Sequence, residues 1–459
     1  MIRESDEKEK RLVMKKMRRV KKRYQRAICV GFVIGIGLGG ILSAGFGIAS
    51  YVLKHQKQET VEVVNQNVIQ GTVSPIENQS EKTLEETLTP TKEPEKIATL
   101  TFTGDLMVHD YQYKSCYDAA TKTYDFSGNF PEVTKYLETA DYTIGNLETV
   151  LGGAQIGITG YPCFNSPDSF ADAIKDAGYD LLTTANNHCV DRGVSAMERT
   201  ITQLNKMKFD HIGTYKTEKA RNKIFVKKIQ GIKIAFLSCT YGTNGISFGE
   251  SYHVNLLNEQ FYEDIKRADQ KADFVIVLPH NGTEYQVTPA VNYQQQYKKM
   301  LECGADAVIA SHPHILQPME YKKIKDADGK KRKCFVAYSL GNFISSQRTV
   351  PRDAGVILTL TVKKKGKHTA IKSVDVIPTW VRMKDTRGKN NFKVFSVYDI
   401  LNYDQKKRKE VISTKDFNRV LQVQTQSTKT LLGTSYSVEE AKESYSFPVE
   451  KKNFNLVSK

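Results

Sequence analysis

The chain has 459 residues, of which 40% are hydrophobic, and a net charge of +16. This length is too great for one small domain and is ample for a large buried core. Residues 1–26 hold 12 Lys and Arg against 4 Asp and Glu, so +8 of the net charge sits in that short tail. The other +8 is spread over 433 residues. The charge therefore marks the N-terminal tail and argues against a nucleic-acid-binding protein.

No charged residue occurs between Ala27 and Leu53. At about 1.5 Å per residue, a helix of this length spans a bilayer core of about 30 Å. The basic flank precedes the apolar segment, which predicts a cytoplasmic N-terminus (residues 1–26) and a single-pass signal anchor (27–53) in the cell membrane. A cleaved signal peptide is the alternative, but the apolar run is longer than a usual signal core and no clear small-residue cleavage site follows it. We expect the rest of the chain to be extracellular.

Residues 54–96 are rich in Gln, Glu, Thr, Asn and Lys and carry three prolines. Apolar residues are few and follow no period, which predicts a disordered polar linker. We expect a folded domain over 97–385 and a polar, basic C-terminal extension of unknown role over 386–459, with a helix around Phe417–Gln424. The six cysteines beyond residue 53 match neither a zinc ribbon nor a small disulfide scaffold, so no pairing is predicted.

Apolar runs alternate with amphipathic segments over residues 97–310, which predicts an α/β fold. Several apolar runs are continuous, as expected for strands covered on both faces. A basic turn near 363–367 joins two further strands into a hairpin. The predicted strands are 97–103, 142–144, 181–184, 232–238, 274–278, 307–310, 335–338, 356–362 and 370–377. The predicted helices are 169–177, 195–207, 259–271 and 293–303.

Each of five apolar runs stops where polar side chains begin. The clusters are Gly104-Asp105, Asn146-Leu147-Glu148, Asn186-Asn187-His188, the segment 280–284 (His-Asn-Gly-Thr-Glu) and His312-Pro313-His314. In α/β sheets, ligands bind beyond the carboxyl ends of the strands. Five clusters meeting there would form a site rich in carboxylate, amide and imidazole groups, which suits one or two divalent metals.

Each cluster by itself has an ordinary explanation. A single Asp after a glycine is more often a turn or a helix cap, and a single His at a strand end is more often structural. Glu284, four residues after His280, is a candidate to orient that imidazole. His312 and His314 are expected to point to the same side of an extended backbone held by Pro313. The combination of all five clusters, rather than any one of them, predicts the metal site.

Six ordered motifs resemble the CapA family, which is named for poly-γ-glutamate capsule synthesis and belongs to the calcineurin-like metallophosphoesterase superfamily. The resemblance covers roughly residues 97–378. The motifs are Gly-Asp-Leu-Met (104–107), Asn-Leu-Glu (146–148), Ala-Asn-Asn-His (185–188), His-x-Gly-x-Glu-Tyr (280–285), Ser-His-Pro-His (311–314) and Tyr-Ser-Leu-Gly-Asn-Phe (338–343).

The resemblance implies a four-layered α/β/β/α fold with two central sheets and a site for two divalent metals, Mn, Fe or Zn, at their edge. It implies that His188 is a catalytic proton donor. It also implies a set of substrate-contacting or supporting residues: Asn146, Asn186, Glu284 and Asn342. The metal ligands that it implies are Asp105, Glu148, Asn187, His280, His312 and His314.

Two departures from the superfamily pattern concern the first two loops. The first loop usually reads Asp-x-His, but Met107 takes the place of the His here, and His109 lies two residues further on. Glu148 replaces the usual Asp of the second loop. These changes predict that one of the two metals is held weakly.

Three functions remain open. The first is an anchored extracytoplasmic protein in synthesis or export of an anionic polymer such as poly-γ-glutamate, with the membrane and polymer-synthesis membrane proteins as partners. The second is a general metal-dependent phosphoesterase, in which two metals would activate a water and His188 would protonate the leaving oxygen. The third is a non-catalytic module that binds the polymer. We expect no nucleic-acid partner.

Overall fold

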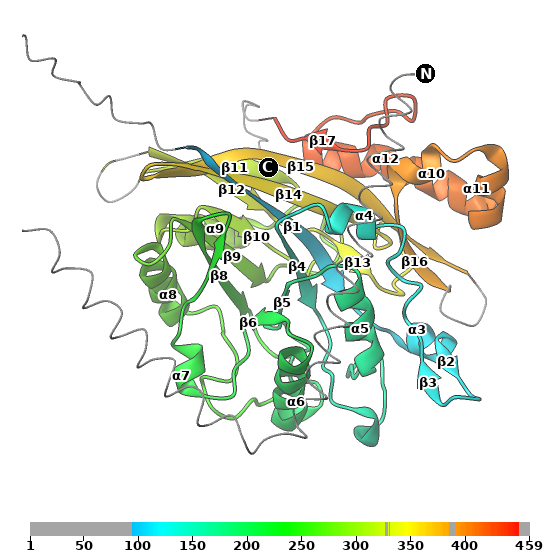
Figure 1. Ribbon diagram of the computed structural model, residues 1–459, viewed down its shortest axis with the longest axis horizontal. Coiled ribbons are helices and arrows are strands. Elements are labelled where there is room, and N and C mark those ends of the chain that lie inside the picture. The colour runs from blue at the N-terminus through cyan, green and yellow to red at the C-terminus, as the bar shows by residue number, and fades with distance from the viewer. Residues whose placement is uncertain (1–93, 326–328, 330, 385–390, 449–459) are drawn as a thin grey trace, which may run out of the picture. The chain divides into compact units, whose positions relative to one another are not determined.

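A computed structural model of the protein describes residues 94–325, 329, 331–384 and 391–448. These described residues belong to one compact unit (Figure 1). Among the described residues, no helix combines the length and the apolar composition that a membrane crossing requires. The predicted tail (1–26) and anchor (27–53) lie outside the described residues, as does the predicted linker (54–96) up to residue 93.

The larger sheet contains nine strands, seven of which follow the order β16-β15-β14-β1-β4-β5-β6. β13 pairs with β1, and β17 pairs with β15. The sheet is mixed, because β1, β4, β5 and β6 run parallel while β14, β15 and β16 are antiparallel neighbours. The strands are β1 (Lys96–Leu106), β4 (Tyr142–Leu147), β5 (Leu181–Thr183), β6 (Asp210–Ile212), β13 (Asn342–Ile344), β14 (Ala354–Lys365), β15 (His368–Met383), β16 (Phe392–Ser396) and β17 (Tyr445–Ser446).

The smaller sheet has the order β11-β12-β10-β9-β8-β7. Its central strands β8, β9, β10 and β12 are parallel, and the edge strands β7 and β11 are antiparallel to their neighbours. Every residue of β9 is buried, as expected for a strand covered on both faces. The strands are β7 (Phe225–Ile229), β8 (Ile232–Thr240), β9 (Phe274–His280), β10 (Ala307–Ile309), β11 (Met319–Lys325) and β12 (Lys331–Ala337).

The two sheets pack face to face, with helices on their outer faces. Alternate residues of β1 (Leu100 and Phe102) and of β8 (Ile234 and Phe236) share one buried cluster between the sheets. The opposite face of the larger sheet packs on α5 (Asp168–Asp176) and, at Leu204, on α6 (Gly193–Lys206). The opposite face of the smaller sheet packs on α8 (Glu259–Asp269) and α9 (Val291–Glu302). This confirms the predicted α/β class.

The C-terminal residues add to the same core. Strand β16 extends the larger sheet, and α12 (Thr414–Leu432) packs on β14 and β15 with Val420 and Val423 in the cluster between the sheets (Figure 1). Ser413 caps the start of α12 in a capping box with Asp416, and Gly433 ends it at φ +70°. The helix predicted around 417–424 lies within α12.

The remaining elements are too short to show an amphipathic pattern, so they were not predicted from the sequence. The four predicted inter-strand helices match α5, α6, α8 and α9 to within two residues at each end, and all nine predicted strands overlap observed strands. The short elements are α3 (Asp110–Ser115), β2 (Tyr117–Asp118), β3 (Thr123–Tyr124), α4 (Thr134–Leu137), α7 (Glu218–Arg221), α10 (Val397–Leu401) and α11 (Gln405–Val411).

Candidate metal centre

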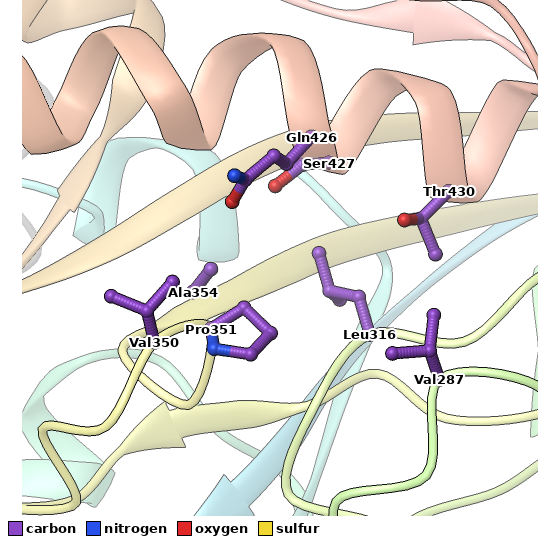
Figure 2. Close-up of a pocket in the computed structure, with 8 residues that line it drawn as sticks. All are labelled: Val287, Leu316, Val350, Pro351, Ala354, Gln426, Ser427 and Thr430. Atoms are coloured by element: carbon purple, nitrogen blue, oxygen red, sulfur yellow. The ribbon is translucent and has the colours of Figure 1, made fainter.

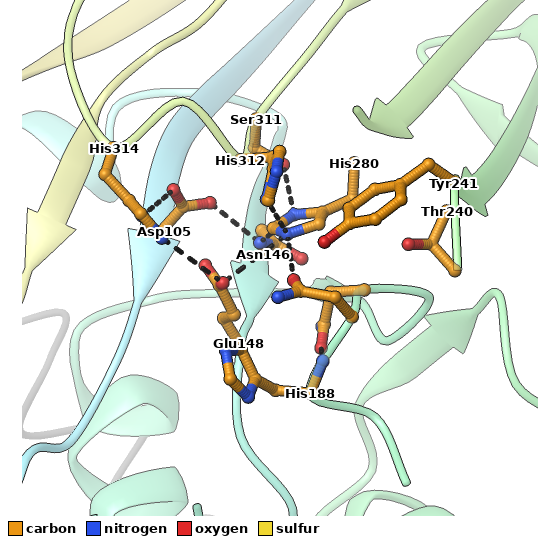
Figure 3. Close-up of polar contacts among 12 residues, drawn as sticks. Asp105, Asn146, Glu148, His188, Thr240, Tyr241, His280, Ser311, His312 and His314 are labelled. Atoms are coloured by element: carbon orange, nitrogen blue, oxygen red, sulfur yellow. Dashed lines mark hydrogen bonds and ion pairs between the residues drawn. The ribbon is translucent and has the colours of Figure 1, made fainter. Parts of the chain in front are cut away.

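The polar clusters meet at the carboxyl ends of parallel strands from both sheets (Figure 3). Asp105 and Asn146 lie opposite each other in the pairing of β1 with β4. His280 ends β9, and a bridge joins it to Ser311 after β10. The structure thus brings together seven predicted residues from five loops or strand ends: Asp105, Asn146, Glu148, Asn187, His280, His312 and His314.

Asp105 is fully buried and held by two neighbours. Asn146 Nδ2 donates to its Oδ1 at 2.8 Å, and His314 Nδ1 lies 3.1 Å from its Oδ2. Burial alone would raise the pKa of Asp105, but the hydrogen bond and charge of His314, with the charge of His280, lower it to about 2. Asp105 is therefore an ionised ligand candidate at neutral pH. Asn342 contacts the same imidazole, with its Oδ1 3.1 Å from His314 Nδ1.

The ring of His280 is held at both nitrogens. Its Nδ1 lies 3.1 Å from Asn146 Nδ2 and 3.1 Å from Ser311 Oγ. Its Nε2 lies 2.8 Å from Asn187 Oδ1 and 3.1 Å from His312 Nδ1. Burial lowers the pKa of His280 to about 3 and that of His312 well below its usual value, so both imidazoles are neutral and able to ligate a metal.

Glu148 is the residue that most directly indicates a cation-binding site. Its side chain is fully buried, yet neither carboxylate oxygen has a hydrogen-bond partner. Oε1 lies 3.4 Å from His280 Nε2 and 3.7 Å from His314 Nε2. Burial and the charge of Asp105 raise the pKa of Glu148 well above its usual value. A buried carboxylate that accepts no hydrogen bond is costly, and a cation beside it would lower that cost.

Two groups of ligand atoms share Glu148. One consists of Asp105, Glu148 and His280, and the other of Glu148, His312 and His314; within each group all ligand atoms lie within 4.8 Å of one another. Carboxylate and imidazole donors suit Zn, Mn or Fe. The residues present therefore fit divalent metal binding, with Glu148 placed to serve both groups.

The backbone of the His-Pro-His segment differs from the prediction. His312 has φ +103° and His314 has φ +59°, so both lie in the left-handed region instead of in an extended chain. Bridges from Ser311 to His280 and from Leu316 to Leu340 fix both ends of this loop, which must turn tightly between them. Both rings still reach the site, with centroids 5.9 Å apart. Strain of this kind costs about 1–3 kcal/mol per residue and is common at functional sites.

His188 forms a separate pair at the edge of the site. Its Nδ1 lies 2.7 Å from Oδ2 of the buried Asp191, which also accepts the backbone N–H of Phe164 at 2.7 Å. The edge of the Phe164 ring packs against the imidazole with centroids 4.7 Å apart. Sequence reasoning missed both residues, although Asp191 stands three residues after His188 and that spacing could have pointed to it. Asn186 supports the loop by accepting the backbone N–H of His188 and donating to the carbonyl of Leu147.

Glu284 lies outside the cluster. Its side chain is exposed, and the His280 ring is positioned by Asn146 and Ser311 instead of by this carboxylate.

The altered first loop leaves no imidazole at residue 107. Met107 is buried, and its backbone N–H donates to Ile344. His109 packs on Phe164 with ring centroids 5.1 Å apart, and burial with the charge of His314 lowers its pKa to about 4. Neither group of ligand atoms in the described residues includes His109.

The fold and the site together define an α/β protein with a buried centre of carboxylates and imidazoles suited to divalent cations. Residues 99–347, more than half of the chain, match the family described as "Bacterial capsule synthesis protein PGA_cap". The chain belongs to this family, which confirms the resemblance drawn from the six motifs.

Two curated relatives carry the same family name. The chain is 27% identical over 284 residues to the PGA biosynthesis protein CapA of Bacillus subtilis, covering 59% of this chain and 69% of the relative. It is 26% identical over 302 residues to the capsule biosynthesis protein CapA of Bacillus anthracis, covering 62% of this chain and 68% of the relative.

Solved structures give a weaker likeness. The calcineurin-like phosphoesterase YfkN of Bacillus subtilis is 15% identical, covers 72% of this chain and 99% of its own, and has a TM-score of 0.37. A hypothetical protein from Thermus thermophilus is 12% identical, covers 61% and 99%, and has a TM-score of 0.36.

Proposed function

We propose that this protein acts outside the cell, anchored to the membrane, in the synthesis or export of poly-γ-glutamate or a related anionic polymer, and that it carries a metallophosphoesterase-like site for two divalent metals. Family membership supports the polymer. The single observation on which the metal site rests is the buried carboxylate of Glu148, which accepts no hydrogen bond and lies among three imidazoles.

The membrane location rests on the sequence. The uncharged segment 27–53 after a basic tail supports a single-pass anchor with the folded unit outside the cell. Membrane-bound polymer-synthesis proteins are the partners that this location favours.

The side chains would have different roles in such a site. Asp105, Glu148, Asn187, His280, His312 and His314 would hold the metals, which when bound supply positive charge that polarises a phosphoryl group and lowers the pKa of water. Asn146 and Asn342 keep Asp105 and His314 in place. Because Asp191 occupies Nδ1 of His188, Nε2 is the nitrogen that can deliver a proton to a leaving oxygen.

The pair of His188 and Asp191 favours a second candidate, a metal-dependent phosphoesterase of general substrates unrelated to a capsule. A buried carboxylate that orients an imidazole is the arrangement expected of a general acid, whereas a polymer-binding module without catalysis has no need for it.

Turnover and polymer formation separate these functions. Full-length protein loaded with Mn²⁺ or Zn²⁺ is assayed with p-nitrophenyl phosphate, and polymer is measured in cells lacking the gene or carrying His188→Ala. Loss of polymer on deletion supports the polymer function, and its restoration by His188→Ala assigns a binding role. Turnover that His188→Ala abolishes, with unchanged polymer on deletion, would establish the general phosphoesterase instead.

A further inference from the structure

A groove lies between α12 and three segments of the domain, at Val287, at Leu316 and at residues 350–354 (Figure 2). Its volume is about 220 Å³, below the roughly 300–1,000 Å³ of common small-molecule pockets. This size favours a narrow chain over a bulky ring. Five lining side chains are apolar: Val287, Leu316, Val350, Pro351 and Ala354.

The other wall of the groove is polar and comes from α12. Gln426, Ser427 and Thr430 of this helix face the apolar loops across the groove. They lie outside the region that matches the family, residues 99–347. Helix α12 therefore supplies one side of the groove, and Val287 and Leu316 on the other side continue the loops that carry His280 and His314.

The groove is continuous in sequence with the metal-binding loops. Leu316 follows His314 by two residues, and Val287 follows Tyr285 by two residues. The Tyr285 ring lies 6.0 Å from the His314 ring, centroid to centroid. A chain lying in the groove would thus extend toward His314.

Arg352 follows the groove residue Pro351 and is linked through Tyr285 to His314. The guanidinium of Arg352 lies 3.3 Å from the centroid of the Tyr285 ring, and its backbone carbonyl accepts from Asn342, which also contacts His314. Stacking on a ring occupies the face of a guanidinium and leaves its N–H edge able to bind an anion.

Arg352 differs from the other arginines nearby. Arg348 and Arg419 both pair with Asp353, at 3.9 and 2.8 Å. Within the described part of the chain, no carboxylate forms an ion pair with Arg352. A half-buried, oriented guanidinium without an acidic partner is suited to a carboxylate brought by a ligand.

We infer that this groove binds a segment of an extended polymer in which carboxylates alternate with short methylene stretches, as in a γ-linked glutamate chain, and that Arg352 binds the carboxylate nearest the metal centre. The methylene groups would contact the five apolar side chains, and the amide and hydroxyl groups of α12 would meet the polymer amides. The inference rests on the proposed function. It adds the location of the bound polymer and the residue that recognises its carboxylate.

Binding of a γ-linked glutamate decamer to the full-length protein tests this directly. Arg352→Gln should raise the Kd by about tenfold, the loss expected for one charge-assisted contact. Arg408→Gln is the matched control, because Arg408 is also half-buried and stacks on Phe417 at 4.1 Å away from the groove. It should change the Kd by less than about twofold.

A second, independent pair of substitutions tests the apolar wall of the groove. Val287 lines the groove and is 54% exposed, whereas Val291 is 51% exposed and does not line it. Val287→Glu should weaken decamer binding by about tenfold, through like-charge repulsion and loss of apolar contact, and Val291→Glu should leave it unchanged. Thermal unfolding shows whether each variant is folded. If a variant of one pair fails to fold, the other pair of substitutions tests the groove by itself.

The outcomes separate the inference from the proposed function. If the wild type binds the decamer and both Arg352→Gln and Val287→Glu bind it equally well, the groove assignment is overturned while the polymer function stands. If the wild type does not bind the decamer, the groove assignment is overturned, and the polymer function is decided separately by polymer loss on deletion of the gene. A change of oligomeric mass in Val287→Glu would show that a second copy occupies the groove, which also overturns the inference.

Discussion

At the scale of single residues, Glu148 is the residue that best defines the metal centre. Its position was predicted from the sequence, but the lack of hydrogen bonds to its carboxylate was not. Sequence motifs indicated which loops carry carboxylates and imidazoles. They could not show that both oxygens of Glu148 lack hydrogen bonds or that Asp191 holds His188. Such facts depend on packing between segments far apart in the sequence. Two sequence-based expectations, an extended His-Pro-His segment and Glu284 as support for His280, were wrong for the same reason.

Glu148→Gln should have opposite effects on the metal-free and metal-bound protein. Replacing a buried carboxyl group that makes no hydrogen bond should leave the metal-free Tm unchanged or raise it. The rise in Tm on adding Mn²⁺ or Zn²⁺ should be lost, because cation affinity falls by about 100-fold or more. Thermal unfolding with and without metal measures both.

Glu320→Gln is the control for that substitution. Glu320 is also buried, but it accepts from Tyr338 at 2.6 Å and pairs with Lys322 at 2.7 Å. Its replacement should lower the Tm in both states and preserve the metal-induced rise. Equal behaviour of the two variants would contradict the role given to Glu148.

Metal binding should release protons. Burial would lower the pKa of His314, but Glu148 and Asp105 raise it to about 9, so the metal-free imidazole is protonated at pH 7. A metal ligand must be unprotonated. Affinity should therefore increase with pH up to about 9 and level off above it. Calorimetry in buffers of different ionisation enthalpy should find about one or more protons released per chain at pH 7, and release of none would contradict this assignment.

At the scale of secondary-structure elements, the close approach of β1 to the turn before β13 fixes the first loop. The Asp105 N–H donates to the Gly341 carbonyl at 3.0 Å, and a Cβ at Gly104 would lie 1.8 Å from that oxygen. The motif predicted a strand end followed by a polar residue. The need for glycine at this contact follows from β13, which the sequence patterns did not predict.

Gly104→Ala should destabilise the protein by about 3 kcal/mol or more, because backbone atoms must move to admit the methyl group. Denaturant unfolding measures this loss. Gly242→Ala is the control, since an added Cβ there meets no atom within 4 Å, and it should be neutral or slightly stabilising. A Gly104→Ala variant as stable as Gly242→Ala would contradict the described contact.

At the scale of the whole molecule, the layered architecture was predictable because buried parallel strands leave continuous apolar runs and their helices leave amphipathic ones. The C-terminal residues carry a weaker signal. Strand β16 and α12 become part of the core only through partners such as Trp380 and Val374, far away in sequence. Their sequence therefore resembles a polar extension although their apolar side chains are buried.

Removing the residues after Lys384 should prevent stable folding. The truncation uncovers the face of β14 and β15 and deletes buried side chains including Phe395, Val420 and Val423. Each buried aliphatic or aromatic side chain contributes about 1.5–3 kcal/mol, and whole domains are stable by only about 5–15 kcal/mol. Circular dichroism and protease resistance of the truncated chain test this. A cooperative unfolding transition like that of the full chain would contradict it.

The most direct test of the metal centre is the metal content of full-length protein purified without chelators, measured by inductively coupled plasma mass spectrometry beside an Asp105→Ala, His280→Ala double variant. We expect at least one divalent ion per wild-type chain, with the weakly held second ion present in part, and a clear loss of metal in the variant, which lacks two of the three residues of one ligand group. A wild type without a stoichiometric divalent ion, or a variant that retains the same content, would contradict a metal centre at these residues.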